Sequence, residues 1–259
     1  MNRIRFLTAV CALAALVGLA SLNSAARAQG GKTATLKGKV TYDGDPPARA
    51  NLGPKFQAVP KDAPHCAKGG PDDTEDPTWI VDKNTKGVEY AVVFLKFASA
   101  PKYNFADTGL GKDVVIDQPF CAFKPHVSVV DVKDQKLIVK NSAPMLHNTR
   151  MAGNPIKNPA KNENVSPNSQ KVFAVKSDTV PIKVNCDVHK WMEGYVWAFD
   201  HPFAAVTKAD GTFEIKGVPP GSVSVVVWHE PDLFPLTKDG KKIDLKEGEN
   251  SLPEVKVKK

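Results

Sequence analysis

The sequence has few of the features that mark several large classes of protein. After residue 28 it has no apolar run approaching the roughly 18 residues that a membrane-spanning helix needs. It shows no glycine-rich phosphate loop, no stretch of about ten residues with the 3.6-residue apolar period of a helix, and no carboxylate pair suited to glycosidase or protease chemistry. With 18 glycines, 21 prolines and 24% charged residues in a chain of 259, the composition also excludes collagen-like, fully disordered and polytopic membrane proteins.

The first 28 residues have the pattern of a secretory leader. Arg3 and Arg5 precede an apolar run over residues 6–22, and Ala26-Arg27-Ala28 forms a small-x-small cleavage site. We therefore expect cleavage after Ala28 and a periplasmic or secreted protein with no membrane span.

The formal net charge is +7 at pH 7, but three of the positive charges, on Arg3, Arg5 and Arg27, belong to the predicted leader. The remaining basic residues are scattered among acidic ones and form no single stripe. This pattern predicts a solvated surface and no nucleic-acid partner.

Short alternating or apolar runs separated by turn residues predict an all-β protein, because sandwiches and barrels are built from strands at such spacing. The strands are expected at residues 36–42, 88–97, 114–117, 127–132, 136–141, 171–175, 182–185, 195–199 and 222–228. A hairpin is predicted over residues 205–215 with Asp210-Gly211 at its turn, and one or two edge strands over residues 238–259. Residues 48–77 and 151–170 lack an apolar period and are expected to be loops.

The cysteines give the first functional clue. Without the leader, the chain keeps Cys66, Cys121 and Cys186, an odd number in an oxidising compartment. At least one of the three is therefore unpaired, and an unpaired thiol survives there only if it is buried or binds something.

The neighbours of Cys186 indicate what it binds. The run from Cys186 to Met192 places a thiol, the imidazole of His189 and a thioether on one loop between two predicted strands. His147 supplies a second imidazole at the end of another predicted strand. Two histidines, one cysteine and a weakly bound methionine are the ligand set of a trigonal copper site with a long axial bond.

These motifs resemble the type 1 copper proteins, the cupredoxins of the plastocyanin and amicyanin kind. The spacing Cys-x2-His-x2-Met before Glu193-Gly194-Tyr195-Val196 is similar to the short amicyanin ligand loop, and His147-Asn148, six residues after Asn141, matches the first-histidine segment. Phe123-Lys124-Pro125 resembles the Phe-x-Pro strand entry of the family.

The resemblance implies a Greek-key β-sandwich that binds one copper ion and carries electrons without being an enzyme. His147, Cys186 and His189 would be equatorial ligands and Met192 the axial ligand. Asn148 would tie the two ligand loops together, so that the site changes little between Cu(I) and Cu(II).

Two features of the site have alternatives. Cys186 could instead form a disulfide with Cys121 or Cys66, which would leave His189 as a surface residue. The preferred pairing is Cys66 with Cys121, because it leaves Cys186 reduced for the metal. His126, after Pro125, could be an extra ligand, although a single histidine beside a strand is more often structural.

The resemblance also implies a route for the electron to an unidentified redox partner protein. His189 would reach the solvent edge, surrounded by an apolar docking patch of Met145, Leu146, Val188 and Trp191. Basic side chains beside it, which would steer an acidic partner, are Arg150, Lys157, Lys161 and Lys190.

A second set of short motifs is similar to the carboxypeptidase regulatory-like, prealbumin-like β-sandwich. These motifs are Gly38-Lys39-Val40, residues 43–47, residues 89–93, residues 207–213 and Pro219-Pro220-Gly221. Their order predicts a cupredoxin domain at 111–200 inserted into a second sandwich formed by residues 29–110 and 201–259.

The sequence thus favours an exported electron carrier. Two alternatives remain open: a structural module of the cell envelope with a vestigial cupredoxin, and an accessory subunit of a copper enzyme.

Overall fold

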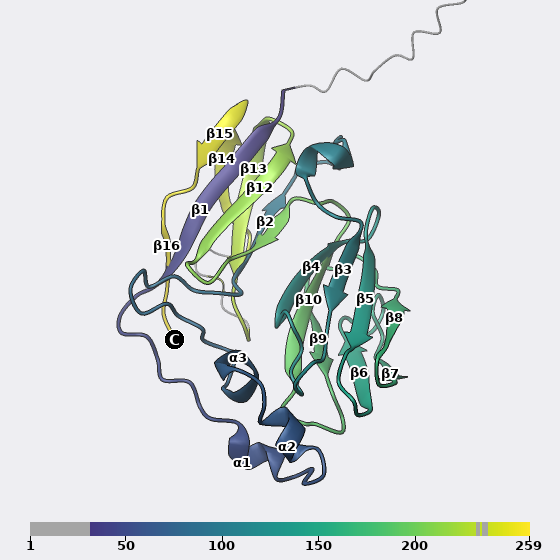
Figure 1. The fold of residues 1–259 in the computed structure, drawn as a ribbon. Helices are drawn as coiled ribbons and strands as arrows, with labels where there is room; N and C mark the ends of the chain where they lie inside the picture. The colour runs from purple at the N-terminus through teal and green to yellow at the C-terminus, as the bar shows by residue number, and fades with distance from the viewer. Residues whose placement is uncertain (1–31, 232–233, 235–237) are drawn as a thin grey trace, which may run out of the picture. The chain divides into compact units, whose positions relative to one another are not determined.

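Strands are the dominant regular structure of the described residues, as the alternating pattern predicted, and the protein is all-β (Figure 1). The computed structural model describes residues 32–231, 234 and 238–259. The predicted leader and its cleavage site lie outside these residues. Across the described ranges, no helix combines the length and the apolar character needed to cross a bilayer.

Strands from both ends of the chain form one pair of sheets, which we call the terminal sandwich. Its strands are β1 (Ala34–Tyr42), β2 (Val92–Lys96), β11 (Ala204–Val206), β12 (Thr212–Val218), β13 (Gly221–Trp228), β14 (Lys241–Leu245), β15 (Gly248–Ser251) and β16 (Val255–Val257). One sheet has the order β12-β1-β15, with β16 also paired to β1, and the other has the order β11-β2-β13-β14. Because β1 pairs antiparallel with β12, the first strand and the segment after residue 200 share a sheet.

The strands between them form a second pair of sheets, the central sandwich. They are β3 (Asp113–Ile116), β4 (Val127–Asp131), β5 (Lys136–Asn141), β6 (His147–Ala152), β7 (Lys161–Val165), β8 (Ser169–Phe173), β9 (Ile182–Asn185) and β10 (Glu193–Phe199). The sheet orders are β4-β10-β9-β6-β7 and β3-β5-β8. The exact domain bounds, and the resemblance of the terminal sandwich to the prealbumin-like family, stay predictions.

Three strands are apolar on both faces, and the packing explains why. On β10, Val196 and Ala198 face the core of the central sandwich, whereas Trp197 and Phe199 face a separate cluster on the other side. Side chains of β2 and β13, including Trp228, fill the same cluster, and the alternate residues of these strands fill the terminal core. Since successive side chains of a strand point to opposite faces, a strand between two cores loses the polar alternation of a surface strand.

The structure corrects the strand predictions in four places. β11 and β12 flank the predicted Asp210-Gly211 turn but belong to different sheets, so residues 205–215 form no two-stranded hairpin. Residues 238–259 form three strands, β14, β15 and β16, instead of one or two. The expected strand over residues 88–97 is reduced to β2, because Tyr90 has a φ of 65°, which breaks the extended backbone before Val92. The expected loop over residues 151–170 contains β7, whose sequence KNENV is exposed at all but its last residue. A polar strand of this kind, paired along one edge to β6, has no apolar period to announce it.

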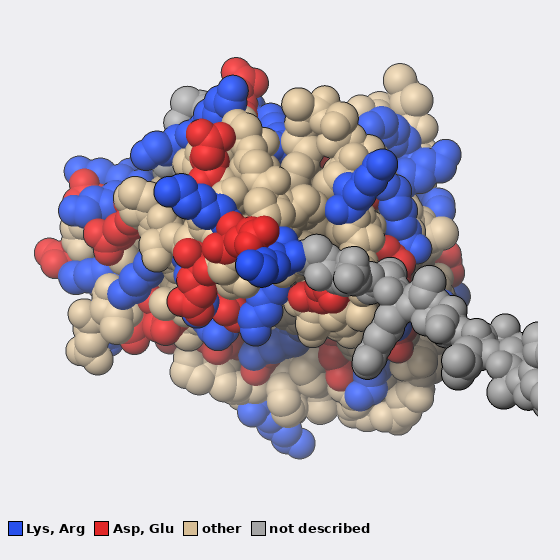
Figure 2. Space-filling view, turned by 90° about the horizontal axis from the view of Figure 1, so that it is seen from above, with Lys and Arg blue, Asp and Glu red and all other residues tan. Residues whose placement is uncertain are grey.

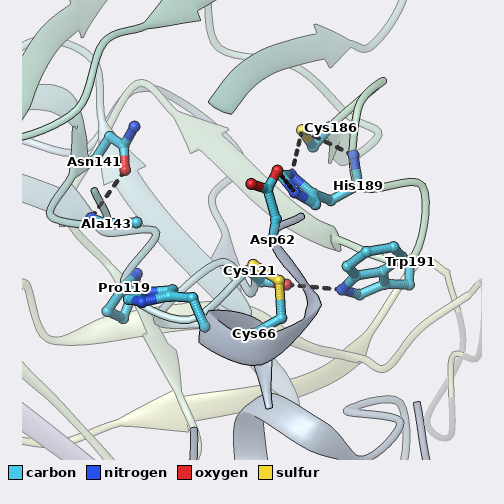
Figure 3. The surroundings of a disulfide bond; sticks show 10 residues. Asp62, Cys66, Pro119, Cys121, Asn141, Ala143, Cys186, His189 and Trp191 are labelled. Carbon is cyan, nitrogen blue, oxygen red and sulfur yellow. Dashed lines mark hydrogen bonds and ion pairs between the residues drawn. A yellow bond between two sulfur atoms is a disulfide. The ribbon is translucent and has the colours of Figure 1, made fainter. Parts of the chain in front are cut away.

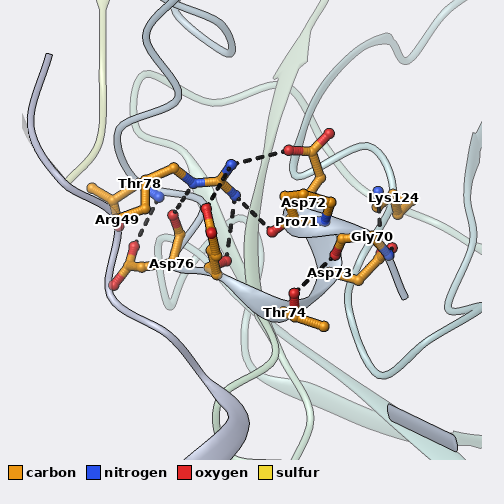
Figure 4. Close-up of polar contacts among 10 residues, drawn as sticks. Arg49, Gly70, Pro71, Asp72, Asp73, Thr74, Asp76, Thr78 and Lys124 are labelled. Atoms are coloured by element: carbon orange, nitrogen blue, oxygen red, sulfur yellow. Dashed lines mark hydrogen bonds and ion pairs between the residues drawn. The ribbon is translucent and has the colours of Figure 1, made fainter. Parts of the chain in front are cut away.

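The segment between β1 and β2 contains three single-turn helices, α1 (Gly53–Phe56), α2 (Ala63–Cys66) and α3 (Pro71–Thr74), and a 3-10 turn, η1 (Phe105–Thr108), follows β2. The guanidinium group of Arg49 orders the segment between β1 and β2. It donates to the carbonyl oxygens of Asp76 and Pro71 and to the carboxylate of Asp72 (Figure 4). Lys124 forms an ion pair of 3.1 Å with Asp73, which attaches the segment to the central sandwich. The predicted loop is therefore ordered.

Charged side chains of both signs are intermixed on the face seen in Figure 2. This is the scattered distribution that the sequence predicted.

Candidate metal centre

One end of the central sandwich brings together three side chains of types that can bind a metal ion. His147 opens β6, and Cys186 and His189 lie in the loop that joins β9 to β10. One ligand atom from each of the three residues lies within 4.8 Å of those of the other two. We call these three residues the donor cluster.

The donor atoms and rings of the donor cluster lie close to one another. Nδ1 of His189 lies 3.9 Å from Sγ of Cys186, and the imidazole rings of His147 and His189 have centroids 4.6 Å apart. The three residues are at most 1% exposed. An ion placed among them would therefore be shielded from bulk water.

The imidazole of His147 is available for a ligand. Neither ring nitrogen of His147 has a hydrogen-bond partner among the described residues. Burial lowers the pKa of His147 to about 3, so that its ring is neutral and keeps a lone pair at neutral pH. Two buried nitrogens without partners carry a free-energy cost in the metal-free protein, and an ion bound at one of them would remove part of that cost.

The cysteines divide as preferred from the sequence. Cys66 and Cys121 form a disulfide, and Cys186 is the free cysteine of the described chain. The alternative in which Cys186 is half of a disulfide is wrong. A second grouping of His189 with the two disulfide sulfurs offers no thiolate and is not a metal site.

Met192 is 1% exposed and belongs to the same core. Its backbone closes the loop over residues 186–192, which we call the ligand loop. The amide of Met192 donates to the carbonyl of His189 at 2.8 Å, and the carbonyl of Met192 accepts from the amide of Cys186 at 3.2 Å. Two residues after Met192, Gly194 lets the backbone pass close to His126, since a Cβ there would lie 2.7 Å from the carbonyl oxygen of His126.

Asn148 links the two ligand loops. Its Oδ1 accepts from the thiol of Cys186 at 3.2 Å and from the amide of Asp187 at 2.8 Å. Its Nδ2 donates to Asn162 on β7 at 2.7 Å, and the Nδ2 of Asn162 donates to the carboxylate of Asp187. Asn162 escaped prediction because it lies in the polar strand that was expected to be a loop.

His126 lies apart from the donor cluster. Its Nδ1 contacts the carbonyl oxygen of Glu193 at 3.0 Å and its Nε2 contacts the carboxylate of Glu230. Both ring nitrogens are thus engaged by the protein. We infer a structural role for His126 between β4 and the end of β13.

The expectation that His189 reaches the solvent edge is wrong. The ring is fully buried, and the carboxylate of Asp62, which directly precedes α2, lies 3.1 Å from its Nε2 (Figure 3). Burial lowers the pKa of His189, and the hydrogen bond to Asp62 partly opposes that shift. The sequence analysis missed Asp62 because this residue lies in a segment without an apolar period, 127 residues before His189.

The expected apolar patch around His189 is only partly exposed. Trp191 is 9% exposed, and its indole nitrogen donates to the carbonyl oxygen of Cys121 at 3.1 Å. Leu146 and Val188 stay exposed, at 44% and 42%.

Comparisons with known proteins give structural neighbours alone. No family model matches the chain, and no curated protein matches it by sequence. Amicyanin from Paracoccus versutus is 16% identical, with 40% of this chain covering 96% of that one at a TM-score of 0.29. A methionine-to-alanine variant of amicyanin in the Cu(I) form is 13% identical and has a TM-score of 0.28, with 40% of this chain covering 97% of that one.

A purple cupredoxin from Nitrosopumilus maritimus is 15% identical, with 33% of this chain covering 99% of that one at a TM-score of 0.28. At these TM-scores the likeness carries no argument about function, which must come from the chain's own residues.

Proposed function

We propose that this chain is an exported one-electron carrier that holds a single copper ion at His147, Cys186 and His189, with Met192 as a fourth, weaker ligand. The observation that carries the proposal is the convergence of two imidazoles and a free thiol in one buried place, with both nitrogens of His147 unpartnered among the described residues. Two nitrogens with one thiolate and a thioether form a set that suits copper. Copper bound there would supply exchange of one electron.

The residues around the donor cluster support such a role because they hold it still. Asn148 joins both ligand loops, and the backbone bonds of Met192 close the ligand loop. A site whose protein groups keep their positions in both oxidation states needs little reorganisation, which favours rapid electron exchange.

The partner in this proposal is a redox protein. It would dock beside the donor cluster over Leu146 and Val188, which are exposed. Arg150 and Lys190, also exposed, would steer an acidic surface toward them. The proposed export depends on the predicted leader.

The test is to load the purified protein with Cu(II) and record its visible and electron paramagnetic resonance spectra. We expect one copper per chain and an intense thiolate-to-copper charge-transfer band, which Cys186→Ala abolishes. The matched control is His126→Ala, which should keep the band and the stoichiometry. A colourless protein would contradict the proposal and favour a structural module, and more than one copper per chain would favour a copper-enzyme subunit.

A further inference from the structure

A carboxylate from a distant part of the chain reaches the edge of His189 that faces away from Cys186. Asp62 is 7% exposed and is 127 residues from His189 in the sequence. Its Oδ2 accepts from Nε2 of His189 at 3.1 Å, whereas Nδ1 of the same ring lies toward Cys186 (Figure 3). The two nitrogens of the ring therefore have separate surroundings, one carboxylate and one donor cluster.

The segment that carries Asp62, residues 52–66, is fastened to the central sandwich on both sides of that residue. After it, the disulfide joins Cys66 to Cys121, one helical turn beyond Asp62. Before it, the ring of Phe56 packs against Trp191, with centroids 5.1 Å apart. We call this segment the cap.

The attachment of the cap continues to the ligand loop. The indole of Trp191, two residues after His189, donates to the carbonyl oxygen of Cys121. Cys121 therefore forms both the disulfide to the cap and a hydrogen bond to the ligand loop. Within the cap, the amide of Asp62 donates to the carbonyl oxygen of Val59 at 3.0 Å. The backbone that carries the carboxylate is thus held by covalent and packing contacts that do not involve His189.

We propose that Asp62 is a positioning residue of the metal centre: it holds Nε2 of His189 so that Nδ1 is directed at the ion, and the disulfide-anchored cap holds Asp62. This inference rests on the proposed copper function and deepens it. Carboxylates that accept from the outer nitrogen of a metal-bound histidine fix the orientation of the ring and raise its basicity. A more basic ligand and a nearby negative charge both favour Cu(II) over Cu(I), so Asp62 lowers the reduction potential of the site.

The cap also has a consequence for access. It covers the outer edge of His189 with protein, so small oxidants and a partner's surface meet the cap instead of the ring. Replacing Asp62 by alanine should admit water to that edge, whereas replacing it by asparagine should keep the shape of the cap and an oxygen acceptor, but not the charge.

The experiment compares Asp62→Asn and Asp62→Ala with the wild-type protein by redox titration and electron paramagnetic resonance. We expect both variants to have a more positive reduction potential, with the larger shift and a broadened, heterogeneous copper spectrum in Asp62→Ala. Asp178→Asn is the matched control, since Asp178 is buried at 8% exposure and its carboxylate contacts Asn158 and Thr179. It should leave the potential at the wild-type value.

A second comparison tests the role of the disulfide. Replacing Cys66 and Cys121 together by serine should move the reduction potential in the same direction as Asp62→Ala. In a protein that already carries Asp62→Ala, the serine replacements should add little, because both changes act on the same interaction between Asp62 and His189. Nitrogen-15 NMR of the metal-free protein gives a readout without copper. We expect the proton on Nε2 of His189 to be protected from solvent exchange in the wild-type protein and to lose this protection in Asp62→Ala.

The outcomes separate this inference from the proposed function. A wild-type protein with no charge-transfer band would overturn the copper function itself. A wild-type protein with the band, and Asp62 variants with the wild-type potential, spectrum and exchange protection, would overturn the role of Asp62 alone. Stability measurements by chemical denaturation show whether a variant has merely unfolded, in which case Asp62→Asn, the least disruptive change, decides.

Discussion

Two buried histidine sites in this molecule are chemically alike and yet differ in what they can do. In the donor cluster, both nitrogens of His147 lack a partner within the described chain. At His126, which is 5% exposed, the backbone of Glu193 and the carboxylate of Glu230 engage both nitrogens. Burial by itself therefore does not mark a metal site. The mark is a set of lone pairs that converge and that the protein leaves unsatisfied.

The largest effect that would test this difference is expected at His147. We predict that His147→Leu lowers copper affinity by more than about 100-fold, because it removes one of the three proposed main ligands. The same change should raise the free energy of unfolding of the metal-free protein by about 1 kcal/mol, since it removes two unpartnered buried nitrogens. Copper titration and chemical denaturation measure the two effects, and a metal-free protein made markedly less stable would contradict the account.

The opposite pattern is expected at His126. We predict that His126→Leu leaves the copper spectrum unchanged and lowers the free energy of unfolding by about 3 kcal/mol, because the carboxylate of Glu230 then stays buried without its partner. Glu230→Gln, which keeps a polar partner for the ring, should cost less. Loss of copper from His126→Leu would show that the two sites are coupled.

The last expected effect concerns pH. Burial lowers the pKa values of His189, His201 and His229, and that of His147 to about 3, below the ordinary value of 6.5. The unfolded chain therefore binds protons first as the pH falls below about 6.5, so the metal-free protein loses stability in acid. Each such histidine contributes a slope of at most about 1.4 kcal/mol per pH unit.

His147→Leu isolates the contribution of one histidine to this slope. Denaturation of the metal-free variant between pH 6 and pH 4 should show a slope smaller by about one proton than that of the wild type. An unchanged slope would mean that His147 is already protonated in the folded protein. A protonated ring has no lone pair for a metal ion, so this result would contradict the proposed site.

Much of the candidate site could be predicted from the sequence because its information is local. Cys186, His189 and Met192 lie within seven residues of one another, and a strand-flanked loop of that length can direct its side chains to one place. His147 required a resemblance, since a lone histidine at a strand end has no spacing to identify it. The all-β fold followed from short alternating runs, whose period of two residues is visible in any stretch of chain.

What could not be predicted depends on contacts between distant segments. Asp62 reaches His189 across 127 residues, and His126 reaches Glu230 across 104. Neither carboxylate lies in a motif, and the cap that carries Asp62 has no period because it packs through single contacts and a disulfide. The prediction of an exposed His189 failed for this reason: the ligand loop alone cannot reveal that another segment covers it.

The most direct test of the central claim is X-ray absorption at the copper edge of the loaded protein in both oxidation states. We predict one short copper-to-sulfur distance from Cys186 and two nitrogen neighbours from His147 and His189, with little change on reduction. A copper ion surrounded by oxygen atoms, or one without a thiolate sulfur neighbour, would contradict it.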